Sequence, residues 1–281
     1  TSMTMLSINT NVGALTAAQH SYSVNKSMET SMERLASGKR VNSAADDAAG
    51  LAIATRINYE IQGLQQSIQN AADAQAMLAT AEGALEEVHT ILLRMRELAL
   101  QSANDTVRNQ DRDMLQMEIN QLEAEIQRIS DDTTWSGLTL LAGGFSTGAT
   151  FQIGSGRFHQ VNMSISAIDA TTTIANGGLN LSSHVSVQGT AQGYLANISN
   201  AISVISEDRA KYGSFMNRLD HAMANMANVI TNLSTAKGRI MDADYAAESA
   251  NLARTQVLQQ ASMAMLSQAN ASKQNILALF Q

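Results

Sequence analysis

Cysteine is absent from all 281 residues, which excludes a disulfide framework and a thiolate metal site. Proline is absent as well, and a chain without proline can form long helices that are not interrupted. Aromatic residues make up only 4% of the chain, whereas methionine occurs 15 times. Such a composition favours closely packed helices over a large aromatic core.

Charged residues are few, and the basic ones are not clustered. Charged residues make up 15% of the chain, and the formal net charge is -7. No cluster of lysine and arginine offsets that balance, so we do not expect nucleic acid to be a partner. No apolar run reaches the roughly 18 residues that span a bilayer, so we expect no membrane segment.

The opening residues also lack the features of a secretory signal. Residues 1–25 contain no lysine or arginine and no continuous apolar run. A secretory signal peptide needs a positively charged start followed by an apolar stretch. We therefore expect that the chain is not exported by that route.

Motifs that carry catalysis or bind a cofactor are not visible. We find no glycine-rich phosphate loop, catalytic triad spacing or activated thiol, so we expect no enzyme, cofactor or metal. The five histidines lack ligand spacing: His20, His89, His159, His184 and His221. The acidic pairs Asp111/Asp113 and Asp242/Asp244 could be cation ligands, but acidic helix starts explain both more simply.

What the sequence does contain is a long heptad repeat. Apolar residues recur every seven positions at Ile57, Leu64, Ala71, Leu78, Leu85, Leu92 and Ala99. A strict repeat of this length is typical of coiled-coil packing. A break is predicted at 104–106 and another helix over 194–236. A helix between them is predicted from an apolar stripe at Leu115, Ile119, Leu122, Ile126 and Ile129.

The region between these helices is rich in glycine, serine and threonine. Phe151 and Ile153, and then Val161, Met163 and Ile165, alternate with polar residues. Alternation of this kind predicts a β-hairpin, with residues 154–156 in its connection. We interpret this region as a small β-rich insertion.

The two ends of the chain mirror each other. Residues 6–36 and 249–281 both read as helices that carry very little charge. The simplest fold is mainly α, an elongated hairpin-like rod of long antiparallel helices with the β insertion at its tip. A helix of 35 residues would span about 50 Å. The predicted segments are an N-terminal assembly helix (1–40), core-bundle helices (41–135), the insertion (136–192), a returning core helix (193–238) and a C-terminal assembly helix (239–281).

Residues 35–57 join the first helix to the heptad helix. Gly38 fits a left-handed cap, and Ser43 stands three residues before Asp46, as in a capping box. At the other end, Gly238 is expected to end a helix, and Asp242 or Asp244 to cap the next one. An ordinary helix–turn–helix corner remains the alternative. We expect residues 237–244 to run beside the first connector.

A pair of charge-poor helices cannot bury all of its apolar surface. Self-assembly with neighbouring copies is therefore the physical expectation, and before assembly these helices should be partly disordered. The residues expected to be buried by assembly are Ile8, Val12, Leu15, Leu252, Leu258 and Leu266.

Several motifs, in the right order, resemble those of bacterial flagellin. They are Ile8-Asn9-Thr10-Asn11, the stretch from Leu35 to Ile57, the stretch from Arg94 to Asn104, the stretch from Met241 to Ser249, and the stretch from Leu252 to Leu266. The resemblance covers nearly the whole chain. Because the insertion is small, the chain resembles a short flagellin.

The resemblance implies a structural subunit that polymerises into the extracellular filament of the bacterial flagellum. It also implies export through the flagellar type III apparatus, and a secretion chaperone that holds the C-terminal helix. Further implied partners are hook-associated and cap proteins. The alternative is a hook–filament junction protein, which has similar ends but acts as an adaptor.

The resemblance also implies an epitope for an innate-immune receptor, the host toll-like receptor for flagellin. The corresponding residues are Arg94, Leu98, Gln101 and Glu118. For Leu98, helix packing is the alternative role. Leu93 stands where receptor-activating members commonly have glutamine.

Overall fold

The computed structural model describes residues 10–154, 156, 159–170, 179–181 and 184–278. The chain forms two compact units, which we describe separately. The terminal unit is Thr1–Tyr59 with Asn232–Gln281, and the central unit is Glu60–Thr231. The finer division into five segments remains a prediction.

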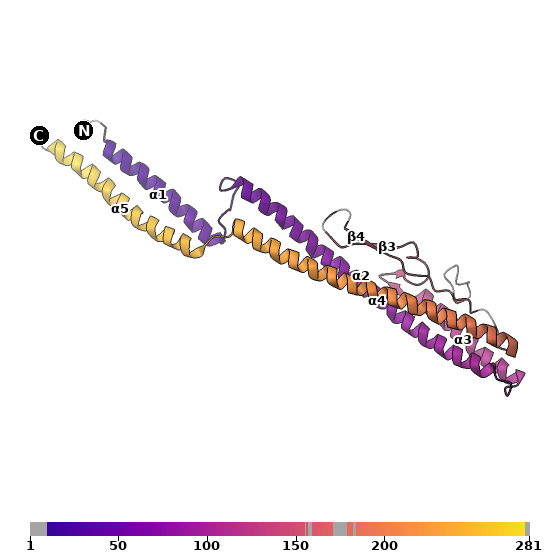
Figure 1. Cartoon of the computed structure of the whole chain (residues 1–281). Coiled ribbons are helices and arrows are strands. Elements are labelled where there is room, and N and C mark those ends of the chain that lie inside the picture. The colour runs from indigo at the N-terminus through magenta and orange to yellow at the C-terminus, as the bar shows by residue number, and fades with distance from the viewer. Residues whose placement is uncertain (1–9, 155, 157–158, 171–178, 182–183, 279–281) are drawn as a thin grey trace. The chain divides into compact units, whose positions relative to one another are not determined.

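The fold is mainly α, as the sequence predicts. Five helices dominate it: α1 (Val12–Ser37), α2 (Ala48–Ser102), α3 (Asn109–Asp132), α4 (Gln188–Met241) and α5 (Tyr245–Ala278) (Figure 1). The described residues also form four short strands: β1 (Thr134–Trp135), β2 (Leu138–Thr139), β3 (Ala149–Gln152) and β4 (Gln160–Met163). Over the described residues, no helix combines the length and the apolar character needed to cross a membrane.

The core of the central unit follows the heptad repeat of α2. Its positions at Leu64, Ala71, Leu78, Leu85, Leu92 and Ala99 are buried. Buried residues of α3 and α4 complete this core: Ile119, Ile126, Ile198, Ile205, Tyr212 and Leu219. The repeat therefore marks the face of α2 that lies in the helix bundle, and the predicted packing is confirmed.

The predicted hairpin is confirmed as well. β3 pairs with β4 in antiparallel register, with Phe151 opposite Val161, and residues 153–159 connect the two strands. Val161 and Met163 are buried, so the hairpin turns one face inward. A second small antiparallel pair, β1 with β2, follows α3 directly. The helix α4 begins at Gln188, inside the predicted insertion.

In the terminal unit, α1 and α5 lie side by side and antiparallel (Figure 1). Residues 38–47 connect α1 to α2, whereas only residues 242–244 connect α4 to α5. The prediction that the two ends of the chain pair with each other is therefore confirmed. The start of α1 at Val12 is later than the sequence suggested, although residues 1–9 lie outside the described part.

Candidate assembly surface and connector

Polar side chains occupy the interior of the α1–α5 pair. Ser31 Oγ donates a hydrogen bond of 2.6 Å to Glu248 Oε1, and both residues are buried. Gln259 Nε2 donates to Asn25 Oδ1 at 2.8 Å. The hydroxyl of Tyr245 donates to the carbonyl oxygen of Leu35 at 2.6 Å. These contacts keep one antiparallel register along the pair, so polar groups rather than apolar ones align the two helices.

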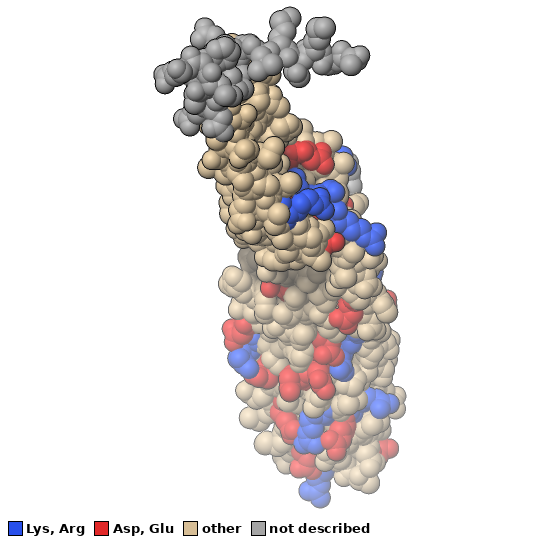
Figure 2. All heavy atoms as spheres, turned by 90° about the vertical axis from the view of Figure 1, so that its left-hand side faces the viewer, with Lys and Arg blue, Asp and Glu red and all other residues tan. Residues whose placement is uncertain are grey.

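Large apolar side chains lie on the outside of the same pair. Val12 is 64% exposed, Leu15 is 62% exposed and Val257 is 65% exposed. Others exposed on these helices are Tyr22, Met32, Leu258, Met263 and Met265. Figure 2 shows that, on the face it draws, charged side chains are sparse on these helices toward the chain ends. The pair thus leaves large apolar side chains exposed while it buries Ser21, Ser31, Glu248 and Thr255. A helix of a soluble protein normally turns its apolar face inward.

The residues that we expected to be buried by assembly fall into three groups. Val12, Leu15 and Leu258 are exposed, and Leu252 and Leu266 are partly buried between the helices. Ile8 lies outside the described residues. A groove of about 510 Å³ runs between α1 and α5 on the exposed side, and Val12, Leu258 and Met265 contribute to its lining.

The predicted pairing of the two connectors is confirmed by backbone hydrogen bonds. The amide of Arg40 donates to the carbonyl of Met241 at 2.6 Å, and the amide of Ala243 donates to the carbonyl of Gly38 at 3.0 Å. Lys39 and Asp242 form an antiparallel bridge between these bonds. Gly38 ends α1 in the left-handed region, with φ of 69°, as predicted.

The predicted cap of α2 is wrong in detail. Asp47, not Ser43, caps the helix, because its Oδ1 accepts the amide of Gly50 at 2.8 Å. Asp46 accepts the amides of Ser43 and Asn42 at 2.9 and 3.1 Å, and so closes the loop before the helix. These backbone hydrogen bonds hold the pKa of Asp46 below its ordinary value. A Cβ at Gly50 would meet the Asp47 carboxylate, so a larger residue there would make the capping side chain shift.

At the second connector, Gly238 does not end a helix. It lies inside α4, which continues to Met241. Its lack of a side chain makes room for Asp242, whose Oδ2 would lie 2.8 Å from a Cβ at this position. Asp242 does not cap α5 either. Asp244 does, by accepting the amides of Ala246 and Ala247 at 2.9 and 3.2 Å.

Three of the four residues predicted for the receptor epitope lie at the surface of the central unit. Arg94 forms ion pairs with Glu118 at 2.9 Å and with Glu97 at 2.6 Å. Gln101 is exposed and is the penultimate residue of α2. Leu98 is only 1% exposed and belongs to the helix core. The surface patch therefore consists of polar side chains, and Leu98 supports it from below.

Sequence reasoning missed the buried polar residues. Glu248 and Thr255 line the interior of the terminal pair, and Asp208 is 3% exposed in the central unit beside Lys211. The sequence does offer one sign of the role of Glu248, because α5 contains no other acidic residue. The described residues contain no cluster of three His, Asp or Glu side chains that could hold a metal ion.

Comparison with known proteins gives a consistent result. Residues 8–146 match the family model for the bacterial flagellin N-terminal helical region, and residues 195–280 match the model for the C-terminal helical region. A flagellin of Halalkalibacterium halodurans is 39% identical over 254 residues, covering 90% of this chain and 92% of that protein. The chain belongs to the bacterial flagellin family.

Two further proteins are similar to the chain, the first in sequence and the second in fold. A flagellin of Bacillus subtilis is 35% identical over 304 residues and covers 98% of this chain and 99% of that protein. A solved structure described as a flagellar hook-associated protein from Vibrio parahaemolyticus has a TM-score of 0.60 and 18% identity, covering 70% of this chain and 100% of that one. At that identity, the second similarity reflects the fold alone.

Proposed function

We propose that the chain is a structural subunit that polymerises into the extracellular filament of the bacterial flagellum and acts without catalysis. Its terminal helices gain their final order when neighbouring subunits dock. Membership of the flagellin family supports the filament role. The observation that carries the mechanism is the set of large apolar side chains that the α1–α5 pair leaves exposed.

Burial of the exposed apolar side chains provides the driving force for this assembly. Val12, Leu15 and Val257 are each more than three-fifths exposed. Each such side chain gains about 1.5–3 kcal/mol when it moves fully out of water. The free pair cannot realise that gain, because these side chains lie outside the contact between its two helices. Neighbouring copies can.

Hydrogen exchange on monomer and filament tests the mechanism. We expect the amides of residues 12–37 and 245–278 to exchange rapidly in the monomer and slowly in the filament, whereas those of α2 stay protected in both. Equal protection of the terminal helices in both states would contradict ordering on assembly.

A pair of matched variants isolates the exposed apolar surface. Val257→Ser removes an exposed apolar side chain from α5, and Leu138→Ser removes one that is 57% exposed on β2. We expect the first to raise the critical concentration for seeded growth and the second to leave it unchanged, because the insertion would face solvent in the filament. Equal effects would argue against a specific role for α5.

A hook–filament junction protein is the second candidate. The relatives that carry high identity over most of the chain are named flagellins, and the similarity to the hook-associated protein extends only to the fold. Electron microscopy separates the two functions. A purified filament subunit forms long filaments after seeding, whereas a junction adaptor does not.

Further partners follow from family membership and belong to this proposal. Export passes through the flagellar type III apparatus, and a secretion chaperone covers α5 before export. The exposed Val257, Leu258, Met263 and Met265 supply an apolar surface for that contact. Hook-associated and cap proteins would lie at the ends of the filament. Arg94, Gln101 and Glu118 would form the polar contact with the host toll-like receptor.

A further inference from the structure

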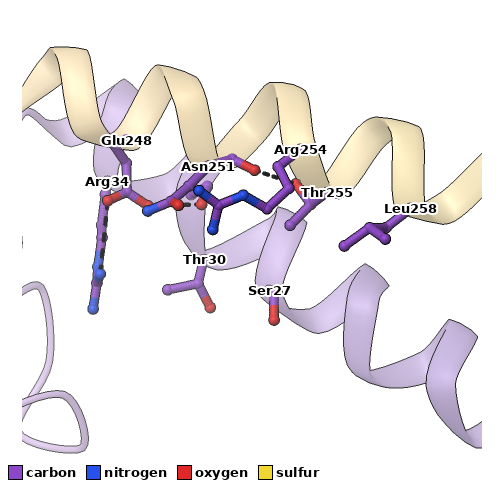
Figure 3. A pocket seen from close by; sticks show the side chains of 9 residues that line it. Ser27, Thr30, Arg34, Glu248, Asn251, Arg254, Thr255 and Leu258 are labelled. Carbon is purple, nitrogen blue, oxygen red and sulfur yellow. Dashed lines mark hydrogen bonds and ion pairs between the residues drawn. The ribbon is translucent and has the colours of Figure 1, made fainter.

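A polar pocket lies beside the buried Ser31–Glu248 contact of the terminal pair. It has a volume of about 450 Å³, and its lining includes Ser27, Thr30, Arg34, Asn251 and Arg254 (Figure 3). The close-up shows that α1 and α5 both contribute side chains to it. This pocket is unusual for the pair, since both guanidinium groups of α1 and α5 gather at it on helices that carry little charge.

The cations of the pocket exceed its anions. Glu248 is its only carboxylate, and Oε1 of that carboxylate already accepts the hydroxyl of Ser31. Arg34 Nη1 lies 3.8 Å from the other oxygen, Glu248 Oε2. Arg34 Nε is buried and has no hydrogen-bond partner. The pocket thus carries one positive charge more than its own carboxylate can balance.

Arg254 is the side chain that supplies this excess. It is exposed, and none of the acidic side chains in the described part of the chain lies within 4.0 Å of it. The hydroxyl groups around it donate their protons within their own helices. Ser27, Thr30 and Thr255 donate to backbone carbonyls three or four residues earlier. Their oxygens could still accept, but within the described residues Arg254 donates no hydrogen bond to them or to any other group.

The pocket adjoins the surface that the proposed assembly would bury. Leu258 lines both this pocket and the apolar groove between α1 and α5. When such a surface loses its water, an unpaired guanidinium group becomes costly unless a carboxylate joins it. A planar guanidinium group suits a carboxylate well, because it can donate two parallel hydrogen bonds.

We propose that this pocket binds a carboxylate side chain from a second copy of the chain, with Arg254 as its main contact and Arg34 behind it. The inference rests on the proposed filament function. Charge complementarity identifies the occupant, because Glu29 and Glu33 are the exposed acidic side chains of α1 and α5. Neither has an ion pair within the described residues. Each copy thus offers both the cationic pocket and an unpaired carboxylate.

Charge reversal tests the contact. We expect Arg254→Glu to raise the critical concentration for seeded filament growth by roughly tenfold or more, which corresponds to 1.4 kcal/mol or more. Arg218→Glu is the matched control, since Arg218 is an exposed arginine of α4 without an ion pair in the described part of the chain. It should leave growth unchanged. Circular dichroism of both monomers should match that of the wild type.

The partner carboxylate is identified by exchanging the two charges. Combining Arg254→Glu with Glu29→Arg or with Glu33→Arg should restore growth in one of the two double variants. Growth of Arg254→Glu at the wild-type concentration would overturn the proposal, and so would failure of both double variants to recover. If 10 mM inorganic phosphate binds the monomer at Arg254 and neither double variant recovers, the pocket is a site for a free anion instead. A wild-type chain that never polymerises would refute the filament function itself.

Discussion

Ser31 and Glu248 meet across the α1–α5 pair in a buried hydrogen bond of 2.6 Å, although 217 positions separate them in the sequence. Glu248 is the only acidic residue of α5, so this contact can form in just one register of the two helices. Buried polar contacts are well suited to specifying register, because a shifted pair leaves them unsatisfied.

We predict that Glu248→Leu loosens this register. The variant removes the polar contact but keeps an apolar side chain able to pack, so the pair still forms while its alignment becomes variable. The chain has no cysteine, so Asn25→Cys with Gln259→Cys gives a clean crosslink for the native register. Oxidation in filaments should yield less of this crosslink in Glu248→Leu, and more from Asn25→Cys with Met263→Cys. Glu248→Gln, which keeps an acceptor for Ser31, serves as the control, and an unchanged crosslink pattern in Glu248→Leu would refute the prediction.

Gly38→Ala should change the shape of the filament more than the stability of the monomer. A residue with a side chain in the left-handed region costs about 1–2 kcal/mol, and Gly38 has φ of 69°. Its carbonyl also accepts the amide of Ala243, so relief of the strain shifts both connectors. Imaging of the filament waveform and a thermal melt of the monomer measure the two effects.

Gly83→Ala is the control for that variant. Gly83 lies within α2, and a Cβ there meets nothing within 4 Å. Alanine is therefore expected to stabilise the helix by about 0.5–1 kcal/mol and to leave the waveform unchanged. A normal waveform in Gly38→Ala would show that the left-handed cap does not influence filament shape.

Variants of two leucines should distinguish an effect on monomer stability from an effect on assembly. Leu92 is fully buried in the helix bundle, and Leu92→Ala should lower the free energy of unfolding of the monomer by about 2–5 kcal/mol. Leu258 is 44% exposed in the terminal pair. Leu258→Ala should change monomer stability by less than about 1 kcal/mol and should raise the critical concentration for growth. Urea unfolding and a pelleting assay measure these quantities, and similar monomer destabilisation by both would contradict the assignment.

Glu123 should make the stability of the central unit depend on pH. Its carboxylate accepts the hydroxyl of Tyr194 at 2.9 Å, and burial raises its pKa above 4.5. A raised pKa in the folded state adds stability that is complete below pH 4.5 and is lost as the pH rises through the folded value. Glu123→Gln keeps an acceptor for Tyr194 but does not titrate. Urea midpoints between pH 4.5 and 8 should therefore fall less in the variant than in the wild type, and parallel curves would exclude Glu123 as the cause.

Substitutions in the proposed receptor patch need a stability measurement beside the receptor assay. Arg94→Ala removes exposed ion pairs, which contribute at most about 1 kcal/mol, so its effect on receptor activation should be direct. Leu98→Ala creates a cavity in the core and should cost about 2–5 kcal/mol. Thermal melts distinguish the two. Equal melting temperatures would mean that Leu98 acts as a contact residue after all.

The helices that could be predicted are those whose pattern lies within their own sequence. The heptad of α2 repeats apolar residues at a fixed interval, so the buried face follows without knowledge of any partner. The pairing of the two connectors could be predicted because each carries a glycine and acidic residues near a helix end. Gly38 in particular takes the left-handed cap that the sequence predicted.

What could not be predicted depends on contacts between distant residues. A glycine between lysine and arginine reads as a helix end, but Gly238 stays helical and its open side receives Asp242. In α1, the lack of charge leaves no polar face by which to orient the helix. Only the partner α5 shows that Ser31 faces inward and Leu15 outward. The pocket at Arg254 likewise requires both helices.

The two connectors differ in length, and this difference determines how twisting is transmitted. Ten residues, 38–47, separate α1 from α2, so they can absorb a rotation of α1 about its own axis. Only three residues, 242–244, separate α4 from α5, and the last turn of α4 is tied to them by the bond from Asp242 to Gly238. We therefore expect a rotation of α5 about its own axis to reach α4 through few rotatable backbone bonds. In a rotating filament, the connector at residues 242–244 would then transmit rotation between helices more directly than the connector at residues 38–47.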